Sequence, residues 1–353
     1  MKRMAEYQRL DEVCHINMGQ SPDSKSYNQE GVGLPFFQGN ADFGAMHPET
    51  RVWCSSPTKI VEAGTLLISV RAPIGALNFA KERSCIGRGL AGITPQNGVS
   101  LKYIYYCLKG KNKELNAKGT GSTFKAIAKS ALGETSVKIV SEEDQLKIIQ
   151  TLDRVSSVIE ARKQQLTELD NLIKARFVEL FYDKGYPVLK WNDVFNTTTG
   201  KLDSNAAVDS GEYPFFTCSK EVLKIDKYAF EQEALLLAGN NAAGKYDVKY
   251  YNGKFNAYQR TYVLGLKEDW SYRLFQYQLE DKLVYLQQQS LGGLTKYLTM
   301  KILGELDFII PPMERQIEFE EFAKQVDKSK VAVQAALDKT QLLFDSLMQE
   351  YFG

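Results

Sequence analysis

Two long segments of this sequence constrain the fold more than any other feature, because each has the pattern of a single helix. From Ser141 to Phe181, hydrophobic residues recur at alternating steps of three and four, with a double step where Arg162 and Arg176 interrupt them. Such spacing is typical of the seam of a coiled coil. A similar segment runs from Pro312 to Phe352. We expect a coiled-coil core made of Leu146, Ile149, Leu152, Val155, Ile159, Leu166, Leu169, Ile173 and Leu180 in the first segment and Val326, Val333, Leu337, Phe344, Leu347 and Tyr351 in the second.

The first segment also has recognisable end signals. Ser141 is followed by three acidic residues, which suit the positive end of a helix dipole. Gly185 and then Pro187 follow the segment and predict its end.

The two segments belong to an internal repeat. Matches farther from the helices keep their order but change their offset, since Gly19 matches Gly200 at 181 and Pro35 matches Pro214 at 179. The chain therefore consists of a globular block followed by a long helix, twice. Around the helices the offset is constant at 171, and it pairs Gly121 with Gly292, Lys125 with Lys296, Leu132 with Leu303, Gly133 with Gly304, Gln145 with Gln316 and Phe181 with Phe352.

Each globular block mixes strand-like and helix-like sequence. Residues 64–70 and 86–94 have strand character, whereas residues 101–108 have helical spacing and several tyrosines. The second block repeats this order. We expect an α+β fold in each block, with a curled sheet and one or two helices, and with loops that differ between the blocks.

Charge is distributed unevenly over these parts. Residues 1–141 contain 18 Lys and Arg against 11 Asp and Glu, a net charge of +7, whereas residues 185–311 contain 14 against 15. The first block is therefore basic, which favours an acidic partner such as nucleic acid. The neutral second block weakens a simple electrostatic argument.

Composition predicts a protein of the reduced cytoplasm. The five cysteines are odd in number and have no C-x-x-C spacing, which argues against a disulfide framework and against a zinc site. We expect no signal peptide and no membrane span, because no run of eighteen apolar residues occurs.

Patterns for catalysis are weak in this sequence. The two histidines, His15 and His47, have no partner pattern for acid–base or nucleophilic chemistry, and no carboxylate cluster has metal-ligand spacing. Residues 239–245 fit the G-x-x-x-x-G-K part of a phosphate loop, but Tyr246 replaces the required Ser or Thr. The following residues also predict a strand and turn instead of a helix. We therefore expect no nucleotide site here.

The repeated layout resembles the specificity (S) subunit of type I restriction–modification systems. The resemblance rests on two variable blocks alternating with two long helices, and on the junctions Gly121-Ser122-Thr123-Phe124-Lys125 and Gly292-Gly293-Leu294-Thr295-Lys296. The second junction continues to Pro311-Pro312-Met313-Glu314-Arg315-Gln316, whereas the first has no double proline before its helix. The resemblance covers essentially the whole chain.

The resemblance implies a division into four parts. Residues 1–140 and 185–311 would be target-recognition domains, each reading one half of a bipartite DNA site. Residues 141–184 and 312–353 would be spacer helices that pair as an antiparallel coiled coil. Methyltransferase (M) subunits, two by this resemblance, would dock on this frame, and motor-nuclease (R) subunits can join. The chain itself would be non-catalytic and hold no cofactor, since S-adenosylmethionine, ATP and Mg²⁺ belong to the partner subunits.

Candidate DNA-binding residues lie at matching places in the two blocks. Lys and Arg contact phosphates, and bidentate Arg, Asn and Gln side chains distinguish bases in the major groove. Lys125 and Lys296 are the strongest candidates, because they hold equal positions in glycine-rich segments. The full set is Gln38, Asn40, Arg71, Arg88, Lys125, Thr217, Ser219, Lys220, Asn240, Asn241, Lys245, Arg260 and Lys296.

Two other interpretations remain open from the sequence. A coiled-coil tether whose blocks bind other proteins fits the neutral second block. An enzyme would depend on the incomplete phosphate loop, and ATP binding lost in Lys245→Ala would support it.

Overall fold

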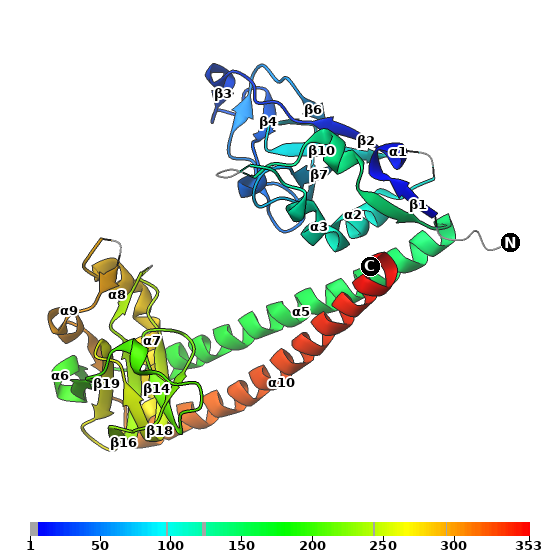
Figure 1. Ribbon diagram of the computed structural model, residues 1–353. Coiled ribbons are helices and arrows are strands. Elements are labelled where there is room, and N and C mark those ends of the chain that lie inside the picture. Colours follow the sequence, from blue (N-terminus) through cyan, green and yellow to red (C-terminus); the bar gives the residue numbers. More distant parts are fainter. Residues whose placement is uncertain (1–5, 97, 122–124, 243, 294) are drawn as a thin grey trace. The chain divides into compact units, whose positions relative to one another are not determined.

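The structure is a computed structural model that describes residues 6–96, 98–121, 125–242, 244–293 and 295–353. It divides into two compact units, one formed by residues 1–163 and 335–353 and the other by residues 164–334. We call them unit 1 and unit 2. Each unit contains one α+β domain and half of each long helix (Figure 1). The predicted fold class is thus confirmed.

Unit 1 contains a four-stranded sheet of order β2-β10-β7-β8 and a five-stranded sheet of order β3-β5-β4-β9-β6, while β1 pairs with β11. The neighbours in the four-stranded sheet are antiparallel, whereas β4 and β9 are parallel. Its elements are β1 (Glu6–Arg9), α1 (Leu10–Val13), β2 (Cys14–Met18), β3 (Tyr27–Asn28), β4 (Leu34–Phe37), β5 (Trp53–Cys54), β6 (Ile60–Val61), β7 (Leu66–Ser69), β8 (Leu77–Phe79), β9 (Ser84–Ile86), β10 (Leu90–Pro95), α2 (Leu101–Gly110), α3 (Asn112–Ala117), α4 (Lys129–Gly133) and β11 (Ser136–Ile139), with short 3-10 helices at Ser24–Ser26 and Asn40–Asp42.

Unit 2 has a similar order of elements, but its strands form one six-stranded sheet, β13-β19-β16-β18-β14-β15, and the two-stranded pairs β12-β21 and β17-β20. Its strand β14 again pairs in parallel, here with β18. Its elements are β12 (Val188–Lys190), α6 (Trp191–Val194), β13 (Phe195–Thr199), β14 (Tyr213–Phe216), β15 (Leu223–Ile225), β16 (Phe230–Ala238), β17 (Asn240–Asn241), β18 (Val248–Ala257), β19 (Thr261–Leu266), α7 (Tyr272–Asp281), α8 (Leu283–Gln289), β20 (Lys296–Tyr297), α9 (Met300–Gly304) and β21 (Asp307–Ile309), with a 3-10 helix at Ser204–Ala206.

Helices α2 and α7 anchor each domain through one apolar face. In both helices the first buried residue is followed by further buried residues three and four positions later. Residues at this spacing lie on the same side of a helix. All of these buried residues except Gln278, which hydrogen-bonds the backbone of Ile309, pack into hydrophobic cores of the two units, and the main cores also contain residues of the buried strands β7 and β16. The buried positions are Tyr103, Ile104, Tyr106, Cys107 and Leu108 in α2, and Leu274, Phe275, Tyr277, Gln278 and Leu279 in α7, each pair 171 residues apart.

The long helices are α5 (Glu142–Phe181) and α10 (Met313–Phe352), each of 40 residues. Their starts and their ends both differ by 171. The Ser141 hydroxyl accepts a hydrogen bond from the backbone N–H of Asp144 (3.2 Å) and so caps α5. The missing double proline in the first half therefore does not change where the helix begins.

The two helices pair antiparallel within each unit. In unit 2, the ammonium of Lys330 lies 2.5 Å from the carboxylate of Asp170, and the guanidinium of Arg176 lies 2.5 Å from the carboxylate of Glu318. Residues later in α5 therefore pair with residues earlier in α10, as antiparallel helices require. In unit 1, Arg162 donates to the carbonyl of Ala336. The two arginines that interrupt the hydrophobic seam thus bridge to the partner helix instead of breaking the pairing.

Of the fifteen expected seam residues, seven are buried, seven are half-buried and one is exposed. In unit 1, Leu152, Ile159 and Phe344 are buried, and in unit 2 Ile173 and Val326 are buried. Leu146 is 55% exposed, so its assignment to the seam is wrong. It lies in the first turns of α5, where Ile149 takes the inward position. The remaining members of the set are half-buried, namely Val155, Leu166, Leu169, Val333, Leu337, Leu347 and Tyr351, or buried, as in Ile149 and Leu180.

Within the described residues, no helix is both long and apolar enough to cross a membrane.

Candidate nucleic-acid interface

A four-residue turn occupies the same place in both units. In unit 1 it joins β9 to β10, and the N–H of Leu90 donates to the carbonyl of Gly87 (3.0 Å). In unit 2 it joins β18 to β19, and the N–H of Thr261 donates to the carbonyl of Tyr258 (2.8 Å). The glycines within 86–94 therefore mark a turn between two strands. β9 and β10 belong to different sheets, and β18 and β19 are not neighbours in theirs, so the turn does not close a hairpin but carries the chain between two separate pairings.

The end of the central strand lies against this turn. After β7, the N–H of Val70 donates to the carbonyl of Gly89 (2.9 Å). After β16, the N–H of Gly239 donates to the carbonyl of Arg260 (2.8 Å). The next residues, Arg71 and Asn240, are consequently placed beside the turn.

A glycine-rich hairpin completes the arrangement. In unit 1, Thr120 and Ala126 exchange two backbone hydrogen bonds of 2.9 Å, and in unit 2 Leu291 and Tyr297 exchange bonds of 3.1 and 2.9 Å. Gly121 and Gly292 have φ of 113° and 105°, a conformation that favours glycine. Residues 122–124 and 294, which belong to these motifs, lie outside the described residues.

Backbone hydrogen bonds attach each hairpin to the central strand. The N–H of Ile127 donates to the carbonyl of Val70 (2.9 Å), and the N–H of Leu298 donates to that of Gly239 (2.8 Å). Lys125 and Lys296 close their hairpins and therefore lie next to Arg71 and to Asn240 and Asn241, respectively.

These three segments form one edge in each unit, which we call the polar edge. In unit 1 it combines Arg71, Arg88 and Lys125, all exposed. In unit 2 it surrounds a hollow of about 420 Å³. The edge thus carries exposed cationic residues from three segments in unit 1, and Asn240, Gln259 and Arg260 beside hairpin residues in unit 2. The hollow is lined by Thr199, Gly239, Asn240, Gln259, Arg260, Tyr262, Thr295, Tyr297 and Leu298.

Two glycines allow another strand to approach the turn closely. A Cβ on Gly19 would lie 2.2 Å from the carbonyl oxygen of Gly87, and one on Gly200 would lie 1.7 Å from that of Ala257. No side chain fits at these distances. The sequence match between the two glycines therefore reflects the same contact in both units.

Tyr262 supports the floor of the hollow in unit 2. Its hydroxyl donates to the carbonyl of Leu298 (3.1 Å), which ties the sheet to the hairpin. Burial raises the pKa of Tyr262, so the phenol stays a neutral donor.

The loop after β4 also reaches the polar edge of unit 1. The carbonyl of Gln38 accepts from the N–H of Gly89 (3.1 Å), and its side-chain amide donates to the hydroxyl of Ser21 (3.0 Å). Asn40 is half-buried at the start of a 3-10 helix. Gln38 is therefore exposed at the polar edge. Asn40 follows it by two residues and is less exposed.

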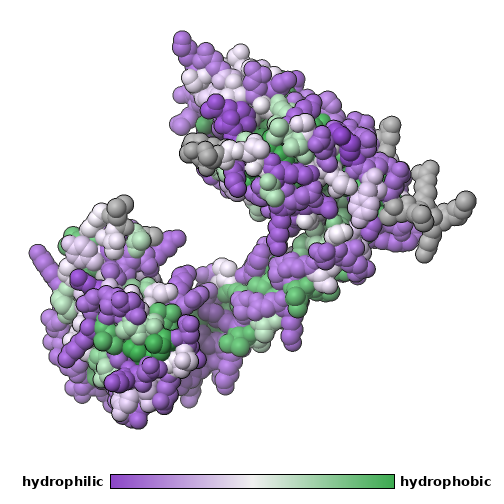
Figure 2. All heavy atoms as spheres, viewed as in Figure 1, coloured by the Kyte–Doolittle hydropathy of each residue, from purple (hydrophilic) through white to green (hydrophobic). Residues whose placement is uncertain are grey.

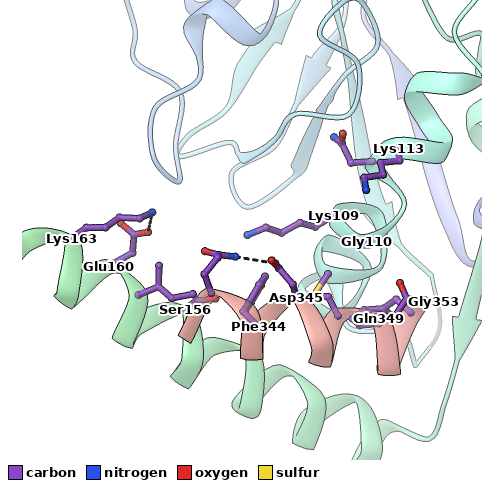
Figure 3. Close-up of a pocket in the computed structure, with 15 residues that line it drawn as sticks. Lys109, Gly110, Lys113, Ser156, Glu160, Lys163, Phe344, Asp345, Gln349 and Gly353 are labelled. Carbon is purple, nitrogen blue, oxygen red and sulfur yellow. Dashed lines mark hydrogen bonds and ion pairs between the residues drawn. The ribbon is translucent and has the colours of Figure 1, made fainter. Parts of the chain in front are cut away.

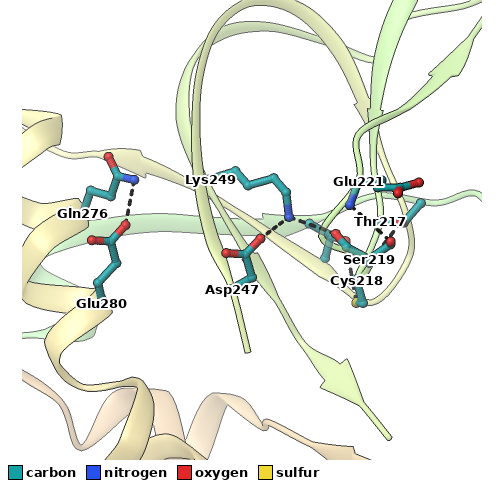
Figure 4. A network of polar contacts seen from close by, with 9 residues as sticks. Thr217, Cys218, Ser219, Glu221, Asp247, Lys249, Gln276 and Glu280 are labelled. Atoms are coloured by element: carbon teal, nitrogen blue, oxygen red, sulfur yellow. Dashed lines mark hydrogen bonds and ion pairs between the residues drawn. The ribbon is translucent and has the colours of Figure 1, made fainter. Parts of the chain in front are cut away.

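The corresponding loop of unit 2 is held by a lysine. Lys249 pairs with Asp247 and donates to the carbonyl of Ser219 (2.9 Å), as Figure 4 shows. Thr217 is only 7% exposed, and its hydroxyl accepts from the N–H of Ser219 (3.2 Å). Thr217 therefore fits a structural role better than the DNA contact that its sequence position predicts. Ser219 and Lys220 are exposed.

The incomplete phosphate loop is followed by a strand. Tyr246 is 7% exposed, and β18 begins at Val248, whereas a phosphate loop must open a helix. The side-chain oxygen of Asn241 accepts from the N–H of Lys245 (3.3 Å), which shapes this loop. Lys245 itself is exposed.

Comparison with known proteins decides the family. A model described as the type I restriction modification DNA specificity domain matches residues 4–171 and 184–340. The chain belongs to this family.

Relatives in the specificity family match part of their own length. The putative MjaX type I restriction enzyme specificity subunit of Methanocaldococcus jannaschii is 38% identical over 160 residues, which are 45% of this chain and 38% of that protein. The EcoDI specificity subunit of Escherichia coli is 33% identical over 156 residues, 42% of this chain and 34% of that protein. The matched segments thus span little more than a third of these two relatives.

A solved structure extends the likeness of fold to the whole chain. The S subunit of a type I restriction–modification system from M. genitalium has a TM-score of 0.63, with 16% identity, and the match covers 99% of this chain and 96% of that one. At this identity the match shows a shared fold and nothing more. The family match does not favour a tether that binds only other proteins.

Sequence reasoning missed two residues of this specificity-family chain. Arg88 occupies the first inner position of its turn, and the residue at that position in unit 2 is Gln259, not Arg260. The constant offset of 171 pairs Arg88 with Gln259 and would have found it. Tyr297, which is 43% exposed, also lines the hollow. An exposed aromatic residue has no sequence signal that separates it from the buried tyrosines.

A larger hollow of about 710 Å³ lies in unit 1 between α2, α5 and α10 (Figure 3). Lys109 extends from α2, and its ammonium lies 5.0 Å from the centre of the Phe344 ring. Lys163 and Glu160 of α5 line the same hollow. This hollow combines apolar side chains such as Phe344 with charged ones, and it lies beside the long helices instead of at the polar edge.

The described residues contain no group of three or more His, Cys, Asp or Glu side chains arranged to hold a metal ion.

Proposed function

We propose that this chain is the DNA-specificity subunit of a type I restriction–modification complex, in which each unit reads one half of a bipartite site. The observation that supports this most is the polar edge, because two units with different loops bring Arg, Lys, Asn and Gln side chains together on equivalent backbone. Such side chains contact phosphates and base edges.

We propose further that catalysis belongs to partner subunits. Adenine methyltransferase subunits would bind S-adenosylmethionine, and a motor-nuclease subunit would use ATP and Mg²⁺. Exposed apolar residues on the long helices support docking of such partners, since Val331 in unit 2 and Leu342 in unit 1 are 70% and 71% exposed. Figure 2 shows apolar side chains among hydrophilic ones on these helices. The hollow beside Lys109 offers a second, partly apolar surface.

The proposed function is tested by selection from random DNA. The full chain, alone and together with an adenine methyltransferase of this class, is incubated with duplexes of randomised sequence, and the bound duplexes are sequenced. We expect two short, unrelated motifs separated by a spacer of fixed length and undefined sequence. Selection of one continuous motif, or of none, would contradict the proposal.

Removing Lys125 or Lys296 should weaken binding to all sequences by a similar factor. A phosphate contact releases about one counterion, so Lys125→Ala or Lys296→Ala should lower the salt slope by about one unit. The measurement is the dissociation constant over a range of salt concentrations, with Lys81→Ala as an exposed lysine control in unit 1. A changed base preference at constant slope would assign these lysines a different role.

Arg88→Ala should relax base choice in the first half-site alone. The loss of a bidentate contact costs about 1–3 kcal/mol at one base pair. Selected sequences should lose that base while the second motif, served by Gln259 and Arg260, is kept. A uniform loss of affinity without a change in the selected motif would show that Arg88 contacts phosphate.

A further inference from the structure

Two buried glutamines make the same pair of hydrogen bonds in the two units. In unit 1, the side-chain oxygen of Gln145 accepts from the N–H of Ser100 (2.9 Å), and its amide donates to the carbonyl of Val140 (3.0 Å). In unit 2, Gln316 accepts from the N–H of Ser271 (2.9 Å) and donates to the carbonyl of Pro311 (2.8 Å). The two side chains are 2% and 1% exposed.

Each glutamine joins the domain to the long helix that follows it. Ser100 and Ser271 immediately precede α2 and α7, the helices that anchor the two domains. The glutamines lie in the first turns of α5 and α10. A buried backbone N–H without a partner is costly, so one amide group satisfies a donor and an acceptor that belong to different segments.

The glutamine makes a polar contact that the two junctions share. A second contact is shared in kind but not in place, because Lys102 and Arg273, which are 171 residues apart, each pair with an aspartate at a different position of the following long helix. In unit 1, Lys102 lies 2.6 Å from Asp153 and the Tyr106 hydroxyl donates to the same carboxylate (2.7 Å). In unit 2, Arg273 lies 2.9 Å from Asp327. The residues whose carbonyls accept from the two glutamines also differ, being valine in one half and proline in the other.

We propose that Gln145 and Gln316 are positioning residues that hold each DNA-reading domain at one orientation on its long helix, and thereby keep the half-site spacing to one value. The spacing part rests on the proposed function, whereas the orientation part does not. If the side chain only stabilised the fold, replacing it would lower the melting temperature but would not widen the range of domain orientations in the folded protein.

Orientation is measured by distances between two spin labels within unit 1. Labels are placed at Lys81→Cys on the domain and Arg154→Cys on α5, both exposed positions. Cys218→Ser removes the one partly exposed native cysteine among the five, and the other four are buried. The full chain is used throughout.

Gln145→Met keeps the size of the side chain but removes all of its hydrogen bonds, including a long one from its amide to the carbonyl of Gly98 (3.4 Å). We expect the width of the distance distribution to increase about twofold, because the domain then rocks on the helix. Gln150→Met, the same change at an exposed position of α5, should leave the width unchanged. Gln145→Glu keeps the acceptor for the N–H of Ser100 and should give a distance distribution of intermediate width. This variant also tests the proposal if Gln145→Met does not fold.

The outcomes separate the two parts of the proposal. An unchanged width in folded Gln145→Met or Gln145→Glu overturns it, as does equal broadening in Gln150→Met. In the DNA selection, Gln145→Met should keep both motifs but accept spacers about one base pair longer and shorter, where one pair adds about 3.4 Å. Broadened distances with an unchanged spacer would overturn the spacing part. If the parental chain selects no bipartite site, the proposed function fails. The spin-label distances still test whether Gln145 fixes the orientation of the domain on its helix.

Discussion

Replacing residues 10–135 with the matching segment of another specificity subunit is expected to change one half of the recognised DNA sequence completely and to leave the other half unchanged. Each mismatched base pair costs about 1–3 kcal/mol, so three or four changed positions abolish binding to the original half-site. The readout is the pair of motifs selected from randomised duplexes by the chimera and by the parent.

The structure supports these boundaries. Unit 1 has its own hydrophobic core and its own polar edge, with Arg71, Arg88 and Lys125 inside the exchanged segment. Residues 10–135 begin after β1 and end before β11, so this antiparallel pair remains native. The hydrogen bond from the N–H of Leu10 to the carbonyl of Thr135 (2.9 Å) closes the segment at its two ends.

The control for this exchange is the opposite one, in which residues 191–306 of unit 2, closed by the hydrogen bond from the N–H of Trp191 to the carbonyl of Leu306 (3.1 Å), are replaced. It should change the second motif and keep the first. Altered sequence in both motifs after either single exchange would show that the units do not read DNA independently.

Inserting one heptad into both long helices should lengthen the spacer between the motifs without changing the motifs themselves. Seven residues add about 10.5 Å to a helix and keep the seam on the same side. At about 3.4 Å per base pair, the spacer can grow by at most about three base pairs. The growth should be smaller when the helix axes are not parallel to the DNA.

The pairing contacts show where the inserted heptads must be placed. Arg162 donates a hydrogen bond to Ala336, and Asp170 pairs with Lys330. Leu166 is midway between Arg162 and Asp170, so it lies approximately opposite Val333. A matched insertion therefore follows Leu166 in α5 and Val333 in α10. A heptad in α5 alone leaves seven residues without partners and should reduce stability and binding together.

Selection from randomised duplexes also measures this effect. The doubly extended chain should recover the parental motifs at a greater distance from each other. Recovery at the original distance, with full affinity, would show that the helices do not set the spacer.

Periodicity in the sequence is sufficient to determine the helical scaffold. The alternation of three and four predicts α5 and α10, because a helix with a narrow apolar stripe must bury it against another. The constant offset of 171 predicts that both helices begin and end at equivalent residues, as they do. Leu146 is the exception, since apolar spacing at a helix end does not show where the partner helix stops covering it.

The polar edge is predicted only in part. Arg71, Arg88, Asn240 and Lys296 stand at matching places in the sequence, but their meeting depends on hydrogen bonds between segments far apart in the chain. The bond from the N–H of Val70 to the carbonyl of Gly89 is one of these.

Burial and long-range pairing decide what the sequence leaves open. Thr217 follows Phe216 as Gln38 follows Phe37, yet Thr217 is buried and Gln38 is exposed. A local pattern specifies which side of a strand a residue takes, whereas exposure depends on which segments pack over that side. The helices and the repeat are therefore determined by the sequence alone, and the partners of each loop side chain only by the tertiary structure.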